Sequence, residues 1–179
     1  YTYYNALTEG AFATGTAASV SAPALNAPVL NTDSASAELQ QAALEAFAST
    51  EGNLDILGWD LADTTSWSGI TWDDSGRVTD ISLAYRGLTG SLDLSSFDAL
   101  GEVDISGNSI SGLILPDAST SVLTWLDCGY NKLTALDILG QPLEMLICSN
   151  NYLDGDAMAE AAASIAFSSC GSQMPTVDI

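Results

Sequence analysis

The chain has 179 residues, of which 47% are apolar and 15% charged, a composition typical of one globular domain rather than a disordered chain. Its 23 acidic and 3 basic residues give a formal net charge of −20, which excludes nucleic acid as a natural partner and disfavours an anionic membrane surface. No apolar run approaches the roughly 18 residues of a spanning helix, so we expect no membrane insertion. A cationic or neutral partner is left open.

Residues 1–32 are rich in Ala, Ser and Thr, and Pro23 and Pro28 interrupt any regular period. This composition predicts a tail or linker. Two interpretations stay open: the segment is disordered, or its aromatic cluster docks on one end of the domain. That cluster consists of Tyr1, Tyr3, Tyr4 and Phe12.

Residues 33–77 are expected to form an amino-terminal cap. Asp33, Ser34 or Ser36 can cap a helix that runs to about Thr50. The residues expected on its apolar face are Leu39, Ala43, Leu44 and Phe47.

A tryptophan-rich stretch follows this helix. Trp59, Trp67 and Trp72 are too large to be left exposed together, so we expect them to pack against the helix. The run of Asp, Ser and Gly at 73–76 predicts a turn between two short strands.

From residue 78 the sequence repeats the pattern L-x-x-L-x-L-x-x-N-x-L. Units begin at 78, 100, 123 and 143, which are 22, 23 and 20 residues apart, and a partial unit begins at 174, so the repeats span 78–179. The first two units are Val78, Ile81, Leu83, Arg86, Leu88 and Leu100, Val103, Ile105, Asn108, Ile110. The next two are Leu123, Leu126, Cys128, Asn131, Leu133 and Leu143, Leu146, Cys148, Asn151, Leu153. The partial unit has Met174, Val177 and Ile179.

Each unit predicts one short parallel strand, and its apolar residues can be buried only when neighbouring units stack. Asn108, Asn131 and Asn151 turn the chain out of the strand, and their amides are expected to bind backbone groups of adjacent units. Arg86 stands in the Asn position of the first unit, as is common in a terminal repeat. Between the fourth and partial units, residues 154–166 predict a helix whose apolar face has Met158, Ala162, Ile165 and Ala166.

The cap and first unit resemble those of plant-type leucine-rich-repeat proteins. The stretches that carry this resemblance are ALEAF, SWSGITWDDSGRVTDISL and GLTGSL, between about Leu39 and Leu92. In that family two cysteines flank the SWSG-type motif, whereas this chain has Thr65 and Trp72 there, so the cap disulfide is absent. The later units LTWLDCGYNKLTALDI and LEMLICSNNYLDGDAMAEAAASI are similar to the shorter repeats of bacterial surface and secreted proteins, which favours a microbial origin.

The resemblance covers about residues 39–179 and implies an α/β fold. The implied fold is a right-handed leucine-rich-repeat solenoid with a short parallel β-sheet on its concave face, an amino-terminal helical cap and a carboxy-terminal helix on the convex side. A shared fold is weak evidence of function. Members of this family mostly bind proteins, peptides or glycans on the concave face, and the resemblance implies the same here.

In this register the outward-facing strand positions form two rows across the concave face. The rows are Asp80, Glu102, Trp125, Met145, Thr176 and Ser82, Asp104, Asp127, Ile147, Asp178. Aromatic residues beside Met, rimmed by carboxylates, have the composition of a binding patch. The alternative is a solvated acidic face with incidental apolar residues. The predicted ligand-binding residues are Asp80, Ser82, Tyr85, Glu102, Asp104, Trp125, Asp127, Tyr130 and Met145.

Asp104 and Asp127 are neighbours in one row, about 4.8 Å apart along the sheet. Two carboxylates so close repel unless a cation lies between them, which makes them a weak Ca²⁺ candidate; no motif supplies the six to eight oxygens that Ca²⁺ prefers. A glycosidase-like acid pair could be built from such carboxylates, but nothing in the sequence predicts the deep cleft that this chemistry needs.

The three cysteines form no CxxC motif, and the chain has no His, so a zinc site or a disulfide scaffold is not expected. Cys128 and Cys148 occupy the same inward position of consecutive units, where we expect them reduced and stacked in the core. A reactive thiol pair is the alternative, although no basic residue is placed to lower a thiol pKa.

Three functions therefore stand beside one another. The leading hypothesis is an extracellular or cell-surface binding module that holds a protein, peptide or glycan, acts as a monomer and needs no cofactor. The second is a structural spacer in a larger adhesin, and the third, less favoured, is a carbohydrate-active enzyme.

Overall fold

The computed structural model describes residues 32–153 and 168–169. The expected tail before Thr32, the expected helix at 154–166 and the expected unit from 174 lie outside these residues. The helices are α1 (Thr32–Ala48), α2 (Asn53–Leu57) and the 3-10 helix η1 (Thr64–Ser66). The strands are β1 (Ile70–Trp72), β2 (Val78–Ser82), β3 (Thr89–Asp93), β4 (Glu102–Asp104), β5 (Ser109–Ile114), β6 (Trp125–Asp127), β7 (Met145–Ile147) and β8 (Ser168–Ser169).

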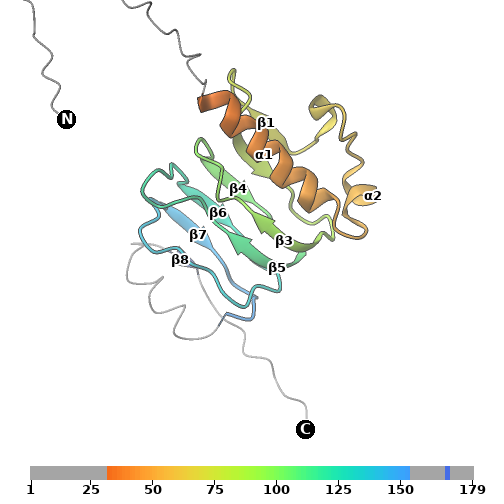
Figure 1. Ribbon diagram of the computed structural model, residues 1–179. Coiled ribbons are helices and arrows are strands. Elements are labelled where there is room, and N and C mark those ends of the chain that lie inside the picture. The colour runs from red at the N-terminus through yellow and green to blue at the C-terminus, as the bar shows by residue number, and fades with distance from the viewer. Residues whose placement is uncertain (1–31, 154–167, 170–179) are drawn as a thin grey trace, which may run out of the picture.

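The strands form a β-solenoid of about 3 turns (Figure 1). Its main sheet has the order β1-β2-β4-β6-β7-β8, in which β1 is antiparallel to β2 and all the other pairs are parallel. The β1–β2 hairpin contains the predicted turn at 73–76. We call residues 78–99 coil 1, 100–122 coil 2, 123–142 coil 3, and the chain from 143 to 153 coil 4.

The strand register confirms the predicted rows in these four coils. Glu102 pairs with Asp80 on one side and with Trp125 on the other, and Trp125 in turn pairs with Met145. The second row runs through Ser82, Asp104, Asp127 and Ile147. The strand beside β7 is β8, however, where Ser169 pairs with Ile147, so it comes earlier in the chain than the predicted unit from 174.

The inward positions of the coils form the core. Strand residues Val78, Ile81, Val103, Leu126 and Leu146 are all at most 2% exposed. Each buried aliphatic side chain of this size contributes about 1.5–3 kcal/mol relative to an exposed one. Because no coil can bury its own apolar side alone, this stabilisation depends on stacking.

The predicted asparagine ladder is present. The side-chain nitrogen of Asn108 donates to the Leu83 carbonyl in coil 1, and its oxygen accepts from the Leu88 amide. Asn131 binds Ile105 and Ile110 of coil 2 in the same way, and Asn151 binds Cys128 and Leu133 of coil 3. The asparagine oxygens thus satisfy buried amides of the preceding coil, and the nitrogens supply donors to its buried carbonyls.

A second, two-stranded parallel sheet joins coils 1 and 2 on another side of the solenoid. It consists of β3 and β5, with an irregularity in the register at Gly90 and Ser91. Coil 3, which is shorter, has no strand at this place.

Helix α1 covers the end of the core beside coil 1 and packs against β3. Leu44 and Phe47 are buried as predicted, but Leu39 is 61% exposed, so its prediction as a core residue was wrong. Gln40 is fully buried instead: its amide donates to the Ser96 carbonyl and accepts from the Val78 amide. The helix therefore docks through hydrogen bonds of Gln40, the residue after Leu39.

Trp59 and Trp67, two of the three tryptophans of the cap, are buried. Trp59 and Trp67 stack with their ring centroids 4.8 Å apart, and Trp72 lies 5.9 Å from Trp67 in a tilted arrangement. The indole nitrogen of Trp67 donates to the Asp60 carbonyl, so the buried ring leaves no polar atom unsatisfied.

Candidate functional site

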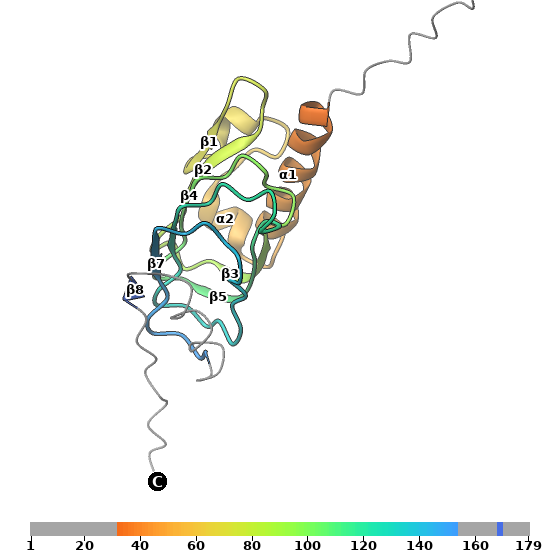
Figure 2. The same ribbon diagram turned by 90° about the vertical axis from the view of Figure 1, so that its left-hand side faces the viewer.

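The candidate site is the outward side of β2, β4, β6 and β7, which we call the sheet face. It comprises Asp80, Ser82, Glu102, Asp104, Trp125, Asp127, Met145 and Ile147. Figure 2 shows the main-sheet strands along one side of the solenoid and α1 along the other. Consecutive strand residues point to opposite faces, so the buried Val103 and Leu126 fix these neighbours outward.

The coil 1 and coil 2 part of the sheet face is acidic. Asp80 and Glu102 lie opposite each other on paired strands, and Asp104 lies two residues after Glu102 on the same face of β4. The Asp80 carboxylate accepts a hydrogen bond of 2.7 Å from the Thr79 hydroxyl. Within the described residues none of these carboxylates forms an ion pair, so their charge faces solvent or a ligand.

Asp104 and Asp127 also have a structural role. The Asp104 carboxylate accepts from the amide and hydroxyl of Ser106, and the Asp127 carboxylate accepts from the Gly129 amide. Such bonds to the residue two positions on compete with sheet pairing. In the described part of β4 and β6 these bonds lie where each strand ends.

Burial raises the pKa of Asp127, the hydrogen bond from Gly129 lowers it, and the neighbouring charge of Asp104 raises it further. The two carboxylates are therefore close enough for the charge of Asp104 to affect the pKa of Asp127. In the part of the chain that the structure describes, no group of three or more His, Cys, Asp or Glu side chains is arranged to hold a metal ion. The Ca²⁺ candidate gains no further ligands from the fold.

The coil 3 and coil 4 part of the sheet face is apolar apart from Asp127. Met145 is 41% exposed beside the half-buried Trp125, and Ile147 is half-buried in the next row. Trp125 is thus neither a core residue nor fully exposed, and its visible surface joins that of Met145. The sequence placed Ile147 in the second row, but Ile147 was not among the predicted binding residues. Its outward register beside Asp127 was the feature that could have identified it.

Tyr85 and Tyr130 stand beyond the strand ends in equivalent positions of coils 1 and 3. Both have left-handed backbone, with φ of 54° and 53°, as do Gly107 and Asn150 at the same position of coils 2 and 4. For a residue with a bulky side chain this conformation costs roughly 1–2 kcal/mol. Both tyrosines are more than half exposed, and the ring of Tyr85 covers Gly107, where an added Cβ would collide with it.

The structure brings the predicted site residues together in three groups. Asp80, Glu102 and Asp104 form the acidic part, and Trp125 and Met145 are direct neighbours in the apolar part. Ser82 and Asp127 lie in the second row, on either side of Asp104. Tyr85 in coil 1 and Tyr130 in coil 3 form the third group beyond the strand ends, and coil 2 between them has Gly107 at the equivalent position.

The two core cysteines differ. Cys128 is free and fully buried, and burial, with the Asp127 charge, raises its thiol pKa to about 12. Cys148 is disulfide-bonded, so the prediction that it is reduced was wrong. Both occupy the predicted inward positions, but the period of the repeat carries no information on which thiol is oxidised.

These features define a β-solenoid domain of stacked units with one open sheet face. No family model matches the chain. It is 32% identical over 87 residues to "Receptor protein kinase WSS1" of Oryza sativa subsp. japonica, a match that covers 45% of this chain and 10% of that protein. The chain thus spans about a tenth of the length of this curated relative. Among the described residues no helix is long and apolar enough to cross a membrane.

Proposed function

We propose that the chain is a leucine-rich-repeat module that binds a protein or peptide on the sheet face, which corresponds to the concave face of that family. The ligand would place a basic group over the acidic part and an apolar side chain against Trp125 and Met145. A neutral glycan stacked on the aromatic residues is the alternative ligand. We further propose that the module is monomeric and works outside the cell or at its surface.

Three observations support membership of the leucine-rich-repeat family. The units recur every 20–23 residues with a ladder of buried asparagines, and the chain has a partial similarity to a receptor protein kinase. In addition, Thr65 and Trp72, where plant-type members have cysteines, line one pocket beneath α1.

The single observation that carries the binding proposal is the exposed apolar surface of Trp125 and Met145 beside the acidic part of the sheet face. A solvated face has no physical need for these side chains, because neither fills the core. A large aromatic residue next to Met, rimmed by unpaired carboxylates, is the composition of an interface anchor. Two exposed tyrosines held in strained backbone at the strand ends add to this, since such strain is concentrated at functional sites.

The test is to screen the full chain against a peptide array and a glycan array. We expect binders enriched in Lys or Arg next to an apolar residue, with affinities that fall as salt rises. A protein that binds nothing on either array would favour the spacer function. Hydrolysis of a bound glycan would favour an enzyme.

A further inference from the structure

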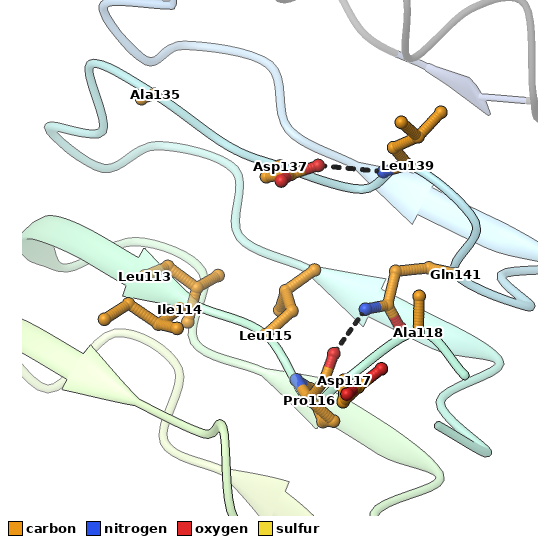
Figure 3. Close-up of a pocket in the computed structure, with 10 residues that line it drawn as sticks. All are labelled: Leu113, Ile114, Leu115, Pro116, Asp117, Ala118, Ala135, Asp137, Leu139 and Gln141. Atoms are coloured by element: carbon orange, nitrogen blue, oxygen red, sulfur yellow. Dashed lines mark hydrogen bonds between the residues drawn. The ribbon is translucent and has the colours of Figure 1, made fainter. Parts of the chain in front are cut away.

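A groove opens on the side of the solenoid away from the sheet face, where coil 2 meets coil 3. Coil 2 has 23 residues and coil 3 has 20, as the spacing of their starting leucines shows. Stacked coils of unequal length cannot match along their whole circumference, so the longer coil overhangs the shorter one. The groove lies at this step, between residues 113–118 and 135–141, with a volume of about 370 Å³ (Figure 3).

The floor of the groove follows the outer edge of β5. Coil 3 is joined to this edge at its start, where the Lys132 amide donates to the Ile110 carbonyl. Beyond that point, no hydrogen bond among the described residues joins 112–115 to coil 3, and β5 pairs only with β3. Since the Ile114 carbonyl accepts from Leu94 on the β3 side, the backbone groups of Leu113 point toward coil 3. An unpaired strand edge therefore faces the groove.

The walls of the groove are apolar and accessible. Ile114 is 51% exposed on one side and Leu139 is 69% exposed on the other, while Leu113 and Leu115 are nearly buried below them. Figure 3 shows Ile114 and Leu139 on opposite sides of the groove. Exposed aliphatic side chains on either side of an open strand edge match the arrangement that accepts an added strand.

The charged residues of the groove are both acidic. Asp117 accepts from the amide and hydroxyl of Ser119, and these bonds lower the pKa of Asp117 and keep it ionised. Asp137 accepts from the Leu139 amide. Each carboxylate uses only its Oδ1 atom in these bonds, which leaves Oδ2 for an incoming cation.

Gln141 lies in the wall of the groove with one half of its amide unsatisfied. Its Nε2 donates to the Pro116 carbonyl at 2.6 Å, which ties the two coils together (Figure 3). Its Oε1 is buried and, among the described residues, has no hydrogen-bond donor.

We propose that this groove is a second binding site, independent of the sheet face, which takes an extended peptide segment by adding it beside β5. The segment has an aliphatic side chain that fits between Ile114 and Leu139, flanked by Lys or Arg residues that pair with Asp117 and Asp137. The unpaired backbone of β5 supplies affinity, and the aliphatic pair and the carboxylates supply sequence preference. The charge of the groove selects a basic partner rather than a second copy of this strongly acidic chain.

The experiment uses the full chain and a phage-displayed library of random short peptides. Peptides selected on the wild type are measured against Leu139→Ser, with Ile56→Ser on α2 as a control that removes an exposed aliphatic residue outside the groove. Charge is tested with Asp137→Asn, which keeps the acceptor for the Leu139 amide. Its control is Asp93→Asn, because Asp93 makes the same kind of bond to Ser95 outside the groove. Met145→Asp reports on the sheet face.

We expect selected peptides to alternate Lys or Arg with aliphatic residues, and to lose at least about tenfold in affinity with Leu139→Ser, the loss that unburying one leucine predicts. Asp137→Asn should weaken them less and reduce their salt dependence, while the two controls and Met145→Asp should leave binding unchanged. The proposal is overturned if no peptide is selected, if the selected peptides lack this pattern, or if Leu139→Ser and Ile56→Ser act alike. Binding lost only with Met145→Asp assigns the peptides to the sheet face.

Two further outcomes would give the groove to another occupant. A dimer of the wild type that Leu139→Ser dissociates, seen by analytical ultracentrifugation, would assign it to a second copy. Slow maleimide labelling of Leu139→Cys in the free protein would mean that part of the chain itself covers the groove, whereas rapid labelling supports an open site. The buried Cys128 thiol serves as the unreactive reference.

Discussion

Asn131 links two coils by donating a hydrogen bond of 2.9 Å from its side-chain amide to the carbonyl of Ile105. The oxygen of the same amide accepts from Ile110, also in coil 2, and the nitrogen is shared with the carbonyl of Cys128 in its own coil. The nitrogen also donates to the Gly129 carbonyl, so one side chain binds four buried backbone groups. This makes the ladder a stability element that can be tested separately from binding.

Asn131→Ala should lower the free energy of unfolding by about 1–3 kcal/mol, because it leaves the buried Ile110 amide without its acceptor and removes one of the donors of the Ile105 and Cys128 carbonyls. Urea denaturation followed by circular dichroism measures this loss. Thr134→Ala, at an exposed position of the same coil, serves as the control and should change stability little. An unchanged midpoint for Asn131→Ala would show that water replaces the amide at no cost.

Gln40→Ala should also destabilise the protein by about 1–3 kcal/mol, since the Val78 amide and the Ser96 carbonyl lose a buried partner. Gln41→Ala is a matched control, because among the described residues the Gln41 side chain binds only Glu45 on the same helix. Thermal unfolding of the two variants decides the matter: equal melting temperatures would mean that α1 docks through its apolar residues alone.

The cysteines should react differently. Cys128, whose thiol pKa is about 12, should resist alkylation in the folded protein at pH 8 and react once the chain is unfolded. Cys148 should react only after reduction as well as unfolding. Mass spectrometry of labelled peptides distinguishes the two, and labelling of Cys148 in unfolded but unreduced protein would contradict the disulfide.

Asp127→Asn should stabilise the domain at neutral pH while keeping the acceptor for the Gly129 amide. The pKa of Asp127 is raised in the folded state, so the folded protein holds this proton more tightly than the unfolded chain does. Its ionisation therefore lowers stability as pH rises from the ordinary value of 3.8 through the raised value. The advantage of Asp127→Asn over the wild type in urea unfolding should appear across that range and persist above it. An advantage confined to lower pH would reverse the sign of the argument.

Trp125→Ala should abolish binding at the sheet face and leave the fold intact, because the half-buried ring lies outside the core. Central aromatic anchors carry about 2–4 kcal/mol of an interface, whereas charge changes at Glu102 should act mainly at low salt. Binding of array-selected ligands and the unfolding midpoint are measured together. A large loss of stability would place the ring in the core, and undiminished binding would move the ligand elsewhere.

The position of each outward side chain on the sheet was predictable. The alternation of a strand and the 20–23-residue period together place Trp125 between Glu102 and Met145, and stacking requires that register. The asparagine ladder was predictable for the same reason, since each coil has backbone groups that only its neighbour can reach. The buried face of α1 was less predictable, because neighbouring faces of this helix both contain apolar residues. Packing chose the stripe with Gln40 rather than the one with Leu39.

By itself, the sequence determined the repeat, the inward and outward residues and the acidic, aromatic composition of the sheet face, because these depend on local periodicity and on contacts between equivalent positions. Only the tertiary structure decided that Cys148 is oxidised while Cys128 is free, since disulfide pairing depends on which thiols meet in space. The tertiary structure likewise decided that β5 ends as an open edge beside Leu139. The lengths of coils 2 and 3 were visible in the sequence, but the groove arises only from how two unequal coils stack.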